Sequence, residues 1–429
     1  MTVRLLVTGD IHIGRRPTRL PAAVDAAAYS CARMWEAIAQ RAVDERVDAV
    51  VLTGDVVDHD NRYFEAIGPL ERGLRLLARH EIPTYAVAGN HDYDVLPQLA
   101  DELGGEFFHL LGRGGVWESA VLECKGTPAI RFWGWSFPEG QVATSPLLAA
   151  SIAAQTDVPS IGILHCDLDS ADSPYAPVTR DQLRAQPVAL WLLGHIHRPA
   201  YVAASSGAGW LYPGSPQAMD PGESGMHGPW IIEFEPAGNV KARQLAMSRV
   251  RYEPLSVDLE GAESRDDLER SVTAKLRRTT AALASESGSL EHLLVRLTFS
   301  GATALCGQIA QFEEQLCGDL ELSAGAATAR IESVANDTRP AIDLEAMAQR
   351  RDPTGVLARL LLDLNAGRAD DELQKLQTQS LLQMQRVQSA PVYQGIGDDA
   401  PPDLTSARSV LLAQGTLLLE ALRNQQHHA

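Results

Sequence analysis

Five short polar runs in the first half of the chain carry side chains that can bind divalent metal ions. The central run, residues 89–92, joins Asn90, a neutral metal ligand, to His91, an imidazole that could meet a phosphate ester. None of the candidate ligands is a thiolate, so soft metals and structural zinc fit poorly, whereas manganese, iron or zinc in a hydrolytic centre fits well. The sequence therefore predicts two divalent ions and seven oxygen or nitrogen ligands: Asp10, His12, Asp55, Asn90, His165, His195 and His197.

The residues beside these ligands suggest how the chemistry is completed. His91 cannot easily coordinate the same ion as its neighbour Asn90, so we predict that it faces the substrate as the catalytic histidine. Asp92 could accept the other imidazole N–H of His91 and hold the ring in one orientation. Asp55 is the candidate bridge, because each of its two oxygens can take one metal. The polar residues 58–61 follow on the next loop, where ordinary loop composition explains them equally well.

Each polar run follows a short apolar segment. Two segments with helical periodicity, residues 22–45 and 70–80, separate the first three runs. This strand, ligand, helix order predicts an α/β layer fold with its site at the carboxyl ends of the strands. In an extended chain residues i and i+2 point the same way, so Asp10 and His12 can reach one metal together. The predicted buried strands that precede the runs are 3–8, 48–53, 82–88, 160–164 and 188–193.

Other features of this half are weaker. Strands are also predicted at residues 129–135, and the segments that begin at Trp210 and Trp230 are predicted to close a sandwich. Cys166 follows His165 directly, but a small buried residue is the better interpretation because nothing else soft lies nearby. Three arginines in one loop, Arg15, Arg16 and Arg19, either attract a phosphate backbone or are simply solvated.

Taken together, the five runs resemble the calcineurin-like metallophosphoesterases, and within that superfamily the SbcD-type DNA-repair exonuclease subunits. The resemblance covers the first half of the chain, and its motifs are specific for the superfamily but less so for nucleases. They are GDIHIG at 9–14, GDVVD at 54–58, GNHD at 89–92, LHCD at 164–167 and GHIHRP at 194–199, with YPGSP at 212–216.

The resemblance implies a four-layer α/β/β/α sandwich and a division of the ligands between two ions. Asp10, His12, Asp55 and His197 would surround one ion, and Asp55, Asn90, His165 and His195 the other. Manganese is the ion that the family implies, with iron or zinc as alternatives. Some nuclease relatives carry a histidine three residues after the bridging aspartate. Here that position is Asp58, and His59 comes one residue later.

The second half of the chain changes character after residue 236. Alternating segments predict a small α+β domain, with strands at 251–259 and 292–299 and helices at 266–283 and 304–317. SbcD-like proteins carry a cap of this order, which guides DNA toward the metals, while a folding or oligomerisation module is the alternative. The predicted domains are a metallophosphoesterase domain at 1–240, a cap at 250–335 and a helical region at 336–429.

The helical region ends in a segment that is rich in leucine. Apolar stripes predict helices before Gly367, at 373–387 and at 407–423, with a loop at 391–402. The last helix carries more apolar surface than one isolated helix can hide. It either packs onto the rest of the chain or docks a partner, for which the family suggests an SbcC-like ATPase with a long coiled coil.

Composition limits the partners and the compartment. The 429 residues suit two or three domains, and 37 Lys and Arg against 55 Asp and Glu leave a net charge of −18. Positive charge for DNA must therefore be local or come from a partner. No apolar run approaches the ~18 residues of a membrane span, and no segment resembles a signal peptide. Five cysteines without CxxC spacing suggest reduced thiols, so we expect a cytoplasmic protein.

The resemblance implies a DNA exonuclease of DNA repair that works with an SbcC-like ATPase, and the ligand set predicts its chemistry. Metal-bound hydroxide would attack the phosphodiester while His91 stabilises the developing charge or protonates the leaving alkoxide. The same chemistry on a small phosphodiester or on a phosphoprotein is the alternative, which the net charge favours. A non-catalytic scaffold is a third hypothesis. A homodimer, common among SbcD-like subunits, would use the predicted helices 22–45 and 70–80, which equally suit a role as sheet-covering helices.

Overall fold

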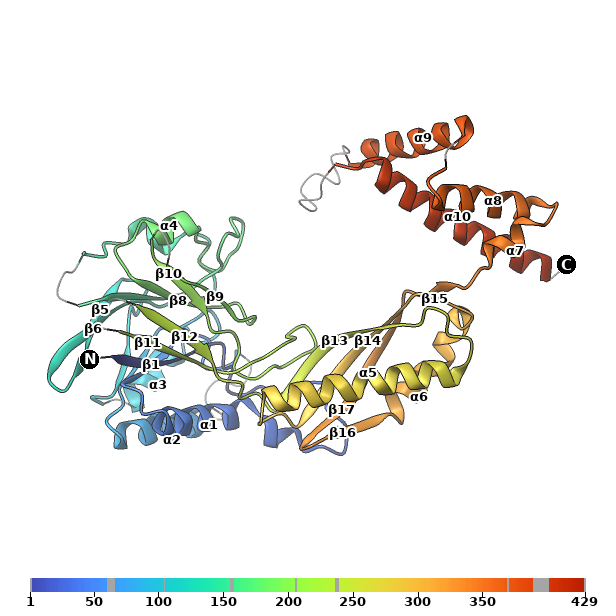
Figure 1. Cartoon of the computed structure of the whole chain (residues 1–429). Coiled ribbons are helices and arrows are strands. Elements are labelled where there is room, and N and C mark those ends of the chain that lie inside the picture. Colours follow the sequence, from blue (N-terminus) through green and yellow to red (C-terminus); the bar gives the residue numbers. More distant parts are fainter. Residues whose placement is uncertain are drawn as a thin grey trace. The chain divides into compact units, whose positions relative to one another are not determined.

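The computed structural model shows a chain that divides into two compact units (Figure 1). The first unit comprises Met1–Val257, Glu269–Phe299 and Ala310–Ala335, and the second comprises Asp258–Leu268, Ser300–Ile309 and Asn336–Ala429. The structure describes residues 2–59, 66–103, 105–154, 158–204, 207–235, 239–368, 370–388 and 401–427.

The first unit is built around two mixed six-stranded sheets. In the first sheet the order is β12-β11-β1-β2-β3-β4, with β1 to β4 parallel and β11 antiparallel to β1. Parallel strands covered on both faces are apolar throughout, which is why the sequence predicted the first three of them. The strands are β1 (Val3–Thr8), β2 (Ala49–Leu52), β3 (Thr84–Ala86), β4 (Phe108–Leu110), β11 (Trp230–Phe234) and β12 (Val240–Gln244).

The second sheet has the order β5-β6-β7-β8-β10-β9. Its four inner strands are parallel, and the edge strands β5 and β9 are antiparallel to their neighbours. The segments predicted to close a sandwich do so from different sheets: Trp210 lies on β10 and Trp230 on β11. The strands are β5 (Glu118–Cys124), β6 (Thr127–Trp135), β7 (Ser160–His165), β8 (Leu190–Gly194), β9 (Ala200–Val202) and β10 (Gly209–Tyr212).

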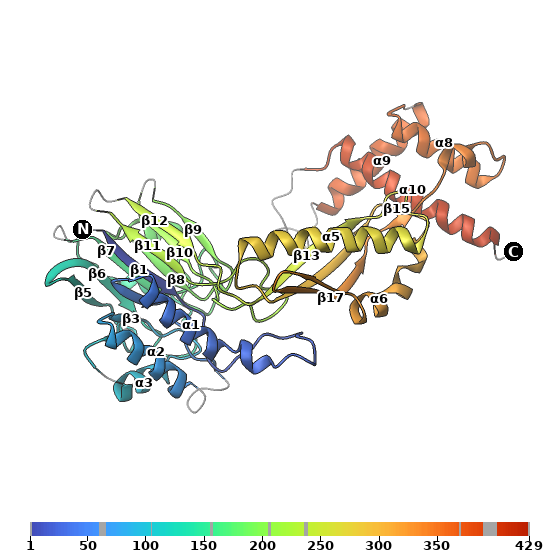
Figure 2. The same cartoon turned by 60° about the horizontal axis from the view of Figure 1, so that its bottom comes forward.

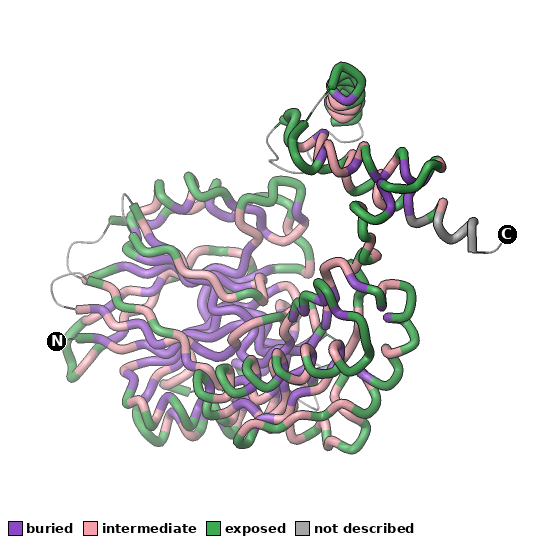
Figure 3. The backbone as a smooth tube through the Cα atoms, turned by 45° about the vertical axis from the view of Figure 1, so that its right-hand side comes forward, coloured by how far each residue is buried: buried purple, intermediate pink, exposed green. Residues whose placement is uncertain are grey.

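Alternating side chains sort the two sheets into layers. Leu5 of β1 packs in the cluster between the sheets with Leu192 of β8, whereas their neighbours Leu6 and Trp191 point to the outer faces. Helices α1 (Cys31–Asp44), α2 (Ile67–Arg79) and α3 (Leu96–Leu103) cover the first sheet (Figure 2). The short α4 (Arg180–Arg184), η2 (Pro146–Ala149) and loops cover the second. The predicted α/β/β/α sandwich is confirmed, and its buried strands form the interior in Figure 3.

The first predicted helix is interrupted near its start. Residues Ala26–Tyr29 form a separate 3-10 turn, η1, whose cap is the Asp25 carboxylate accepting from the Ala27 N–H at 3.0 Å. The α-helix begins only at Cys31, whose N–H donates to the Arg15 carbonyl at 3.0 Å. The prediction of one helix over 22–45 was therefore wrong for residues 22–30, because this backbone is tied to the loop that follows His12.

A four-stranded sheet with two helices follows, and most of it belongs to the first unit. Its order is β13-β14-β17-β16, and Leu268, Val272 and Leu276 form the buried face of α5 at spacings of four residues. The predicted α+β elements are present, and β16 and β17 are additional. The elements are β13 (Val250–Asp258), α5 (Arg265–Glu286), β14 (His292–Ser300), η3 (Cys306–Gln308), α6 (Ile309–Gly318), β16 (Glu321–Ala324) and β17 (Ala327–Asn336).

The second unit consists mainly of helices. Two aspartates begin them: Asp343 caps α7, and Asp352 caps α8 by accepting from the Gly355 N–H at 2.9 Å. Leu361 of α8 and Leu419 of α10 pack in one buried cluster. Residues 391–400 of the predicted loop lie outside the described residues. The elements are α7 (Leu344–Ala348), α8 (Pro353–Asn365), α9 (Asp371–Gln388) and α10 (Leu404–His427), with the strand pair β15 (Ala302–Thr303) and β18 (Arg339–Pro340).

Among the described residues, no helix has the length and apolar character that a membrane span requires. All five cysteines are free thiols.

Candidate metal centre

Six of the seven predicted metal ligands converge where β1, β2, β3, β7 and β8 end. Two groups of predicted ligands each bring their ligand atoms within 4.8 Å of one another: Asp10, His12 and His197 form the first, and Asp10, Asp55 and His165 the second. A further group of this kind joins His12 to Asp58 and His91. The Asn90 amide oxygen joins the second group at 3.0 Å from His165 Nε2.

The seventh predicted ligand, His195, contacts the other ligands through its backbone N–H and its ring. Its backbone N–H donates to Asp10 Oδ1 at 2.9 Å, and its ring lies 5.3 Å, between centroids, from the ring of His165. Burial lowers the pKa of His195 to about 3, so the ring is uncharged near neutral pH and has a nitrogen lone pair available for a metal ion.

Two imidazoles of the first group point at one place. His12 Nε2 and His197 Nε2 are 3.1 Å apart, while the opposite nitrogens contact carboxylates. His12 Nδ1 lies 3.1 Å from Asp58 Oδ1, and His197 Nδ1 lies 2.6 Å from Glu223 Oε1. A carboxylate accepts from a protonated Nδ1, so both Nε2 lone pairs face the same point, which a cation would satisfy.

Asp55 belongs to the second group and also lies close to His12 of the first. Its Oδ2 is 3.4 Å from His165 Nε2 and 3.9 Å from His12 Nε2. Burial alone would raise the pKa of Asp55, but the histidines around it, His165 foremost, hold that pKa well below its ordinary value. A buried carboxylate that stays ionised between two sets of imidazoles is suited to bridge two cations, and the His and Asp clusters fit a dinuclear centre.

The ligands sit on strained backbone. Asp10, His12, Asp55 and His195 have φ of 48°, 53°, 49° and 99°, in the left-handed region that non-glycine residues seldom adopt. The expectation that Asp10 and His12 share a direction because the chain is extended was therefore wrong. Both reach the centre because each backbone N–H is fixed to the neighbouring motif: Asp10 N–H donates to Gly54 O and His12 N–H to Asp55 O, each at 3.0 Å.

Two motif glycines are required by close packing. A Cβ at Gly89 would lie 2.1 Å from Asp55 Oδ1, and a Cβ at Gly194 would lie 2.0 Å from the Thr53 carbonyl oxygen. No side chain fits at such distances, so glycine allows the loops to approach closely around Asp55.

Asp92 does not contact the His91 ring as the sequence suggested. Its Oδ2 accepts from the Val56 N–H at 2.7 Å and the Val57 N–H at 3.3 Å, and its Oδ1 accepts from the Gly89 N–H at 2.7 Å. The side chain is fully buried. These bonds hold the loop after Asp55 against the loop that carries Asn90, so Asp92 positions two loops.

The His91 ring stands at the edge of the centre. Its side chain is 35% exposed, compared with 1% for His12, and the two rings make an edge contact with centroids 4.7 Å apart. His91 Nδ1 lies 3.7 Å from Asp58 Oδ1, and burial of the ring lowers its pKa. The sequence did not decide whether Asp58 faces the site or is an ordinary loop residue. In the structure it lies between His12 and His91. The His59 ring is 6.1 Å from that of His91.

Sequence reasoning missed two neighbours of the ligands. Glu223 contacts His197 from a Gly- and Pro-containing turn that has no metal-ligand spacing, and only its position soon after the YPGSP motif could have indicated it. The Tyr175 ring packs against the His195 ring at 4.9 Å, and no sequence pattern marks it.

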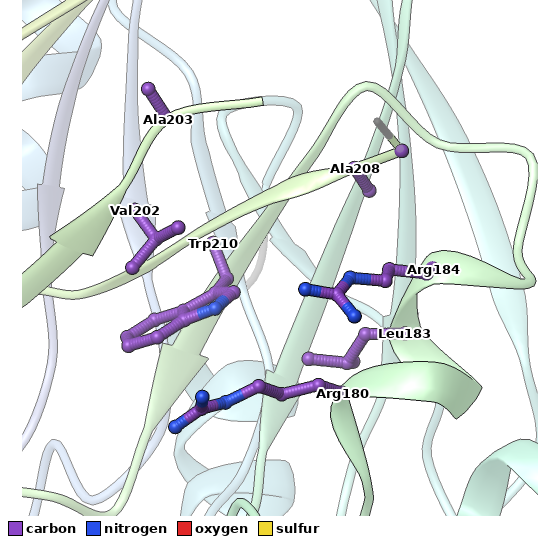
Figure 4. A pocket seen from close by; sticks show the side chains of 8 residues that line it. Arg180, Leu183, Arg184, Val202, Ala203, Ala208 and Trp210 are labelled. Carbon is purple, nitrogen blue, oxygen red and sulfur yellow. The ribbon is translucent and has the colours of Figure 1, made fainter. Parts of the chain in front are cut away.

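One pocket lies apart from this centre. The guanidinium groups of Arg180 and Arg184 lie beside the Trp210 indole there (Figure 4), and none of the predicted ligands lines it. Arg180 pairs with Asp169 at 2.8 Å and Arg184 with Asp181 at 3.4 Å. Both arginines among the described lining residues are therefore already ion-paired.

Comparison with known proteins gives two family matches. Residues 3–199 match the family described as calcineurin-like phosphoesterase, and residues 252–339 match the middle domain of metallophosphoesterase YhaO. The uncharacterized metallophosphoesterase YhaO of Bacillus subtilis is 30% identical over 233 residues, which are 52% of this chain and 54% of that protein.

More distant likenesses are partial. The DNA double-strand break repair protein Mre11 of Methanosarcina acetivorans is 32% identical over 145 residues, 32% of this chain and 23% of that protein. The chain thus spans about half of YhaO and about a quarter of Mre11. Among solved structures, a dimetal phosphatase from Danio rerio aligns with a TM-score of 0.35 and 13% identity, over 56% of this chain and 96% of that one.

Proposed function

We propose that the protein hydrolyses DNA phosphodiesters, because residues 3–199 match the calcineurin-like phosphoesterase family and carry a candidate dimetal site. The observation that carries the proposal is the convergence of carboxylate and imidazole donors around Asp55. We propose manganese as the metal, because oxygen and imidazole donors without thiolates suit it.

The residues divide the work of the reaction. When bound, two divalent ions polarise a phosphoryl oxygen and make water a better nucleophile near neutral pH. Asp10, His12 and His197 would hold one ion, and Asn90, His165 and His195 the other, with Asp55 shared between them. The partly exposed His91 ring would donate a hydrogen bond to a phosphoryl oxygen, or a proton to the leaving alkoxide.

Local positive charge supports an extended anionic substrate. Arg15 and Arg16 follow His12 closely, Arg198 follows His197, and none of the three makes an ion pair with any described residue. Arg19, by contrast, pairs with Glu332 at 3.5 Å. Three uncompensated arginines next to metal ligands would give a chain of net charge −18 a local grip on a phosphate backbone.

The second candidate is the same chemistry on a small phosphodiester or on a phosphoprotein. The net charge of −18 favours it, since it repels long polyanions. The partial likeness to Mre11, a DNA double-strand break repair protein, supports DNA instead. The role in DNA repair is part of our proposal and rests on that likeness, whereas the proposed attack from DNA ends rests on the resemblance to SbcD-type subunits.

A substrate panel separates these candidates. Manganese-loaded protein should shorten end-labelled linear DNA and hydrolyse bis-p-nitrophenyl phosphate, with phosphopeptide turned over far more slowly. Closed circular DNA should resist if cutting begins at ends. Preferred turnover of phosphopeptide, with both DNAs intact, would contradict the nuclease proposal and support the phosphatase.

We also propose that the second unit docks an SbcC-like ATPase. Its helices expose large apolar side chains: Leu382 of α9 is 59% exposed, and Leu417 and Leu418 of α10 are 53% and 54% exposed. A coiled-coil partner would cover such surface. Glutamate at both Leu417 and Leu418 should abolish co-purification with the co-expressed ATPase, and unchanged co-purification would contradict the assignment.

We further propose that the protein forms a homodimer through helices α1 and α2. The outer face of α1 and α2 carries ion pairs, such as Arg72 with Glu36 at 2.6 Å, so a dimer through these helices would have a polar interface. A monomeric mass at micromolar concentration would contradict that dimer.

We also propose a cytoplasmic location, because the five free cysteines suit a reducing compartment. Recovery of the native protein in a secreted fraction would contradict this location.

A further inference from the structure

A carboxylate outside all of the metal-binding motifs is directed at one of the predicted ligands. Glu223 Oε1 lies 2.6 Å from His197 Nδ1, and the Glu223 side chain is only 10% exposed. The residue is presented by a tight turn in which the Gly222 N–H donates to Asp220 Oδ1 at 2.8 Å and the Glu223 N–H to the Asp220 carbonyl at 3.0 Å.

The second oxygen of this carboxylate is fixed as well. Glu223 Oε2 accepts from the Met219 N–H at 2.8 Å and from the Ser215 hydroxyl at 2.9 Å. Ser215 is held in turn by His227, whose Nδ1 lies 2.7 Å from the Ser215 carbonyl oxygen. His227 and Ser215 are almost fully buried. The carboxylate therefore has one orientation, with Oε1 directed at the imidazole of His197.

We propose that Glu223 is a positioning residue that holds the proton of His197 on Nδ1 and so presents the bare Nε2 to the metal ion beside His12. Since His197 Nε2 lies 3.1 Å from His12 Nε2, a proton on His197 Nε2 would block that ion. The hydrogen bond to Glu223 disfavours this tautomer and makes the ring a stronger donor. The inference rests on the proposed metal centre, but not on the substrate.

The support is unequal between the two ions. At the first ion both histidines are backed by carboxylates, His12 by Asp58 and His197 by Glu223. At the second, His165 Nδ1 lies 3.0 Å from a neutral acceptor, the Thr53 carbonyl oxygen. Loss of Glu223 should therefore weaken one of the two ions and leave the other unaffected.

Calorimetric titration of the metal-free full-length protein with Mn²⁺ tests this directly. The wild type should bind two ions, whereas Glu223→Gln should bind one as before and the other about 10- to 100-fold more weakly. Glu235→Gln is the matched control, because it makes the same change at a surface carboxylate that pairs with Lys241. Two ions bound with wild-type affinity by Glu223→Gln would overturn the inference.

A second variant distinguishes positioning from folding. If Glu223 acts through His197, Glu223→Gln should not weaken Mn²⁺ binding further in a His197→Ala background, because the two changes remove one interaction. Additive losses would overturn the positioning role even if the single variant also lowers thermal stability. A wild type that binds no Mn²⁺ would instead contradict the proposed function itself.

Discussion

The imidazole of His91 is more exposed than those of His12, His165 and His197, which face inward. Its backbone N–H donates to Asp55 Oδ1 at 2.9 Å, which anchors the residue beside that carboxylate. This placement suits a group that meets the substrate once the ions are in place.

Replacing His91 by alanine should separate catalysis from metal binding. We expect kcat on a phosphodiester to fall about 10²- to 10⁴-fold, the usual range for loss of an acid–base group, with unchanged Mn²⁺ affinity. Steady-state kinetics and calorimetry on the same preparation check this. Full turnover by the variant would remove His91 from the chemistry.

Asp92 should matter for stability. Asp92→Asn places an NH₂ group against one of the three backbone N–H donors, which then loses its buried acceptor. We expect the free energy of unfolding to fall by about 1–3 kcal/mol. Urea unfolding of metal-free protein measures this, with the exposed Asp101→Asn as control. If Asp92→Asn loses activity but keeps its stability, Asp92 acts in the reaction itself and not in holding the two loops.

Among the elements, the parallel strands were the most predictable. Strands such as β1 and β2 are buried on both faces, so each reads as a continuous apolar run that ends in a ligand. Less predictable were β16, which alternates exposed and half-buried residues, and β17, which alternates buried and half-buried residues only over its first half. The break before Cys31 depends on a bond to Arg15 that is distant in sequence.

The sequence predicted that the candidate ligands converge, but it did not predict the residues that support them. Ligands such as Asp10 follow strands at motif spacing, so the sequence alone groups them. Glu223 reaches His197 across 26 residues, and no local pattern encodes that contact. The role of Asp92 was wrongly predicted for the same reason, since its partner Val56 lies 36 residues earlier in the chain.

Helix α8 should respond to acid through its cap. The Thr354 hydroxyl and the Gly355 N–H lower the pKa of Asp352 to about 2, below its ordinary value of 3.8. A depressed pKa stabilises the fold above the ordinary value, and this contribution disappears as pH falls from about 4 to 2. Hydrogen exchange in α8 should show wild type better protected than Asp352→Asn at pH 6 and equal near pH 2. A difference independent of pH would contradict the charged cap.

For the whole molecule, the proposed DNA substrate raises a question of charge, because the chain is itself strongly acidic. A net charge of −18 makes long-range attraction to DNA unfavourable, so affinity must depend on a few local cations. Those that remain uncompensated beside the centre are Arg15, Arg16 and Arg198.

Salt should therefore weaken DNA hydrolysis more than hydrolysis of a small diester. Arg16→Gln and Arg198→Gln should each lower the slope of log KM for DNA against log salt by about 1. Arg180→Gln, at an arginine already paired with Asp169, serves as the control and should leave the slope unchanged. If all variants have the same slope, Arg16 and Arg198 do not contact DNA phosphates, and the DNA-binding cations lie elsewhere.

The most direct test of the dinuclear phosphoesterase is to follow bis-p-nitrophenyl phosphate hydrolysis while metal-free protein is titrated with Mn²⁺. We predict that wild-type turnover rises to a plateau at two ions per chain, because Asp55 lies close to His165 of its own ligand group and to His12 of the other group. Asp55→Asn, which replaces the shared carboxylate by a neutral amide, should lose nearly all turnover. Full activity without metal, or in Asp55→Asn, would contradict the account.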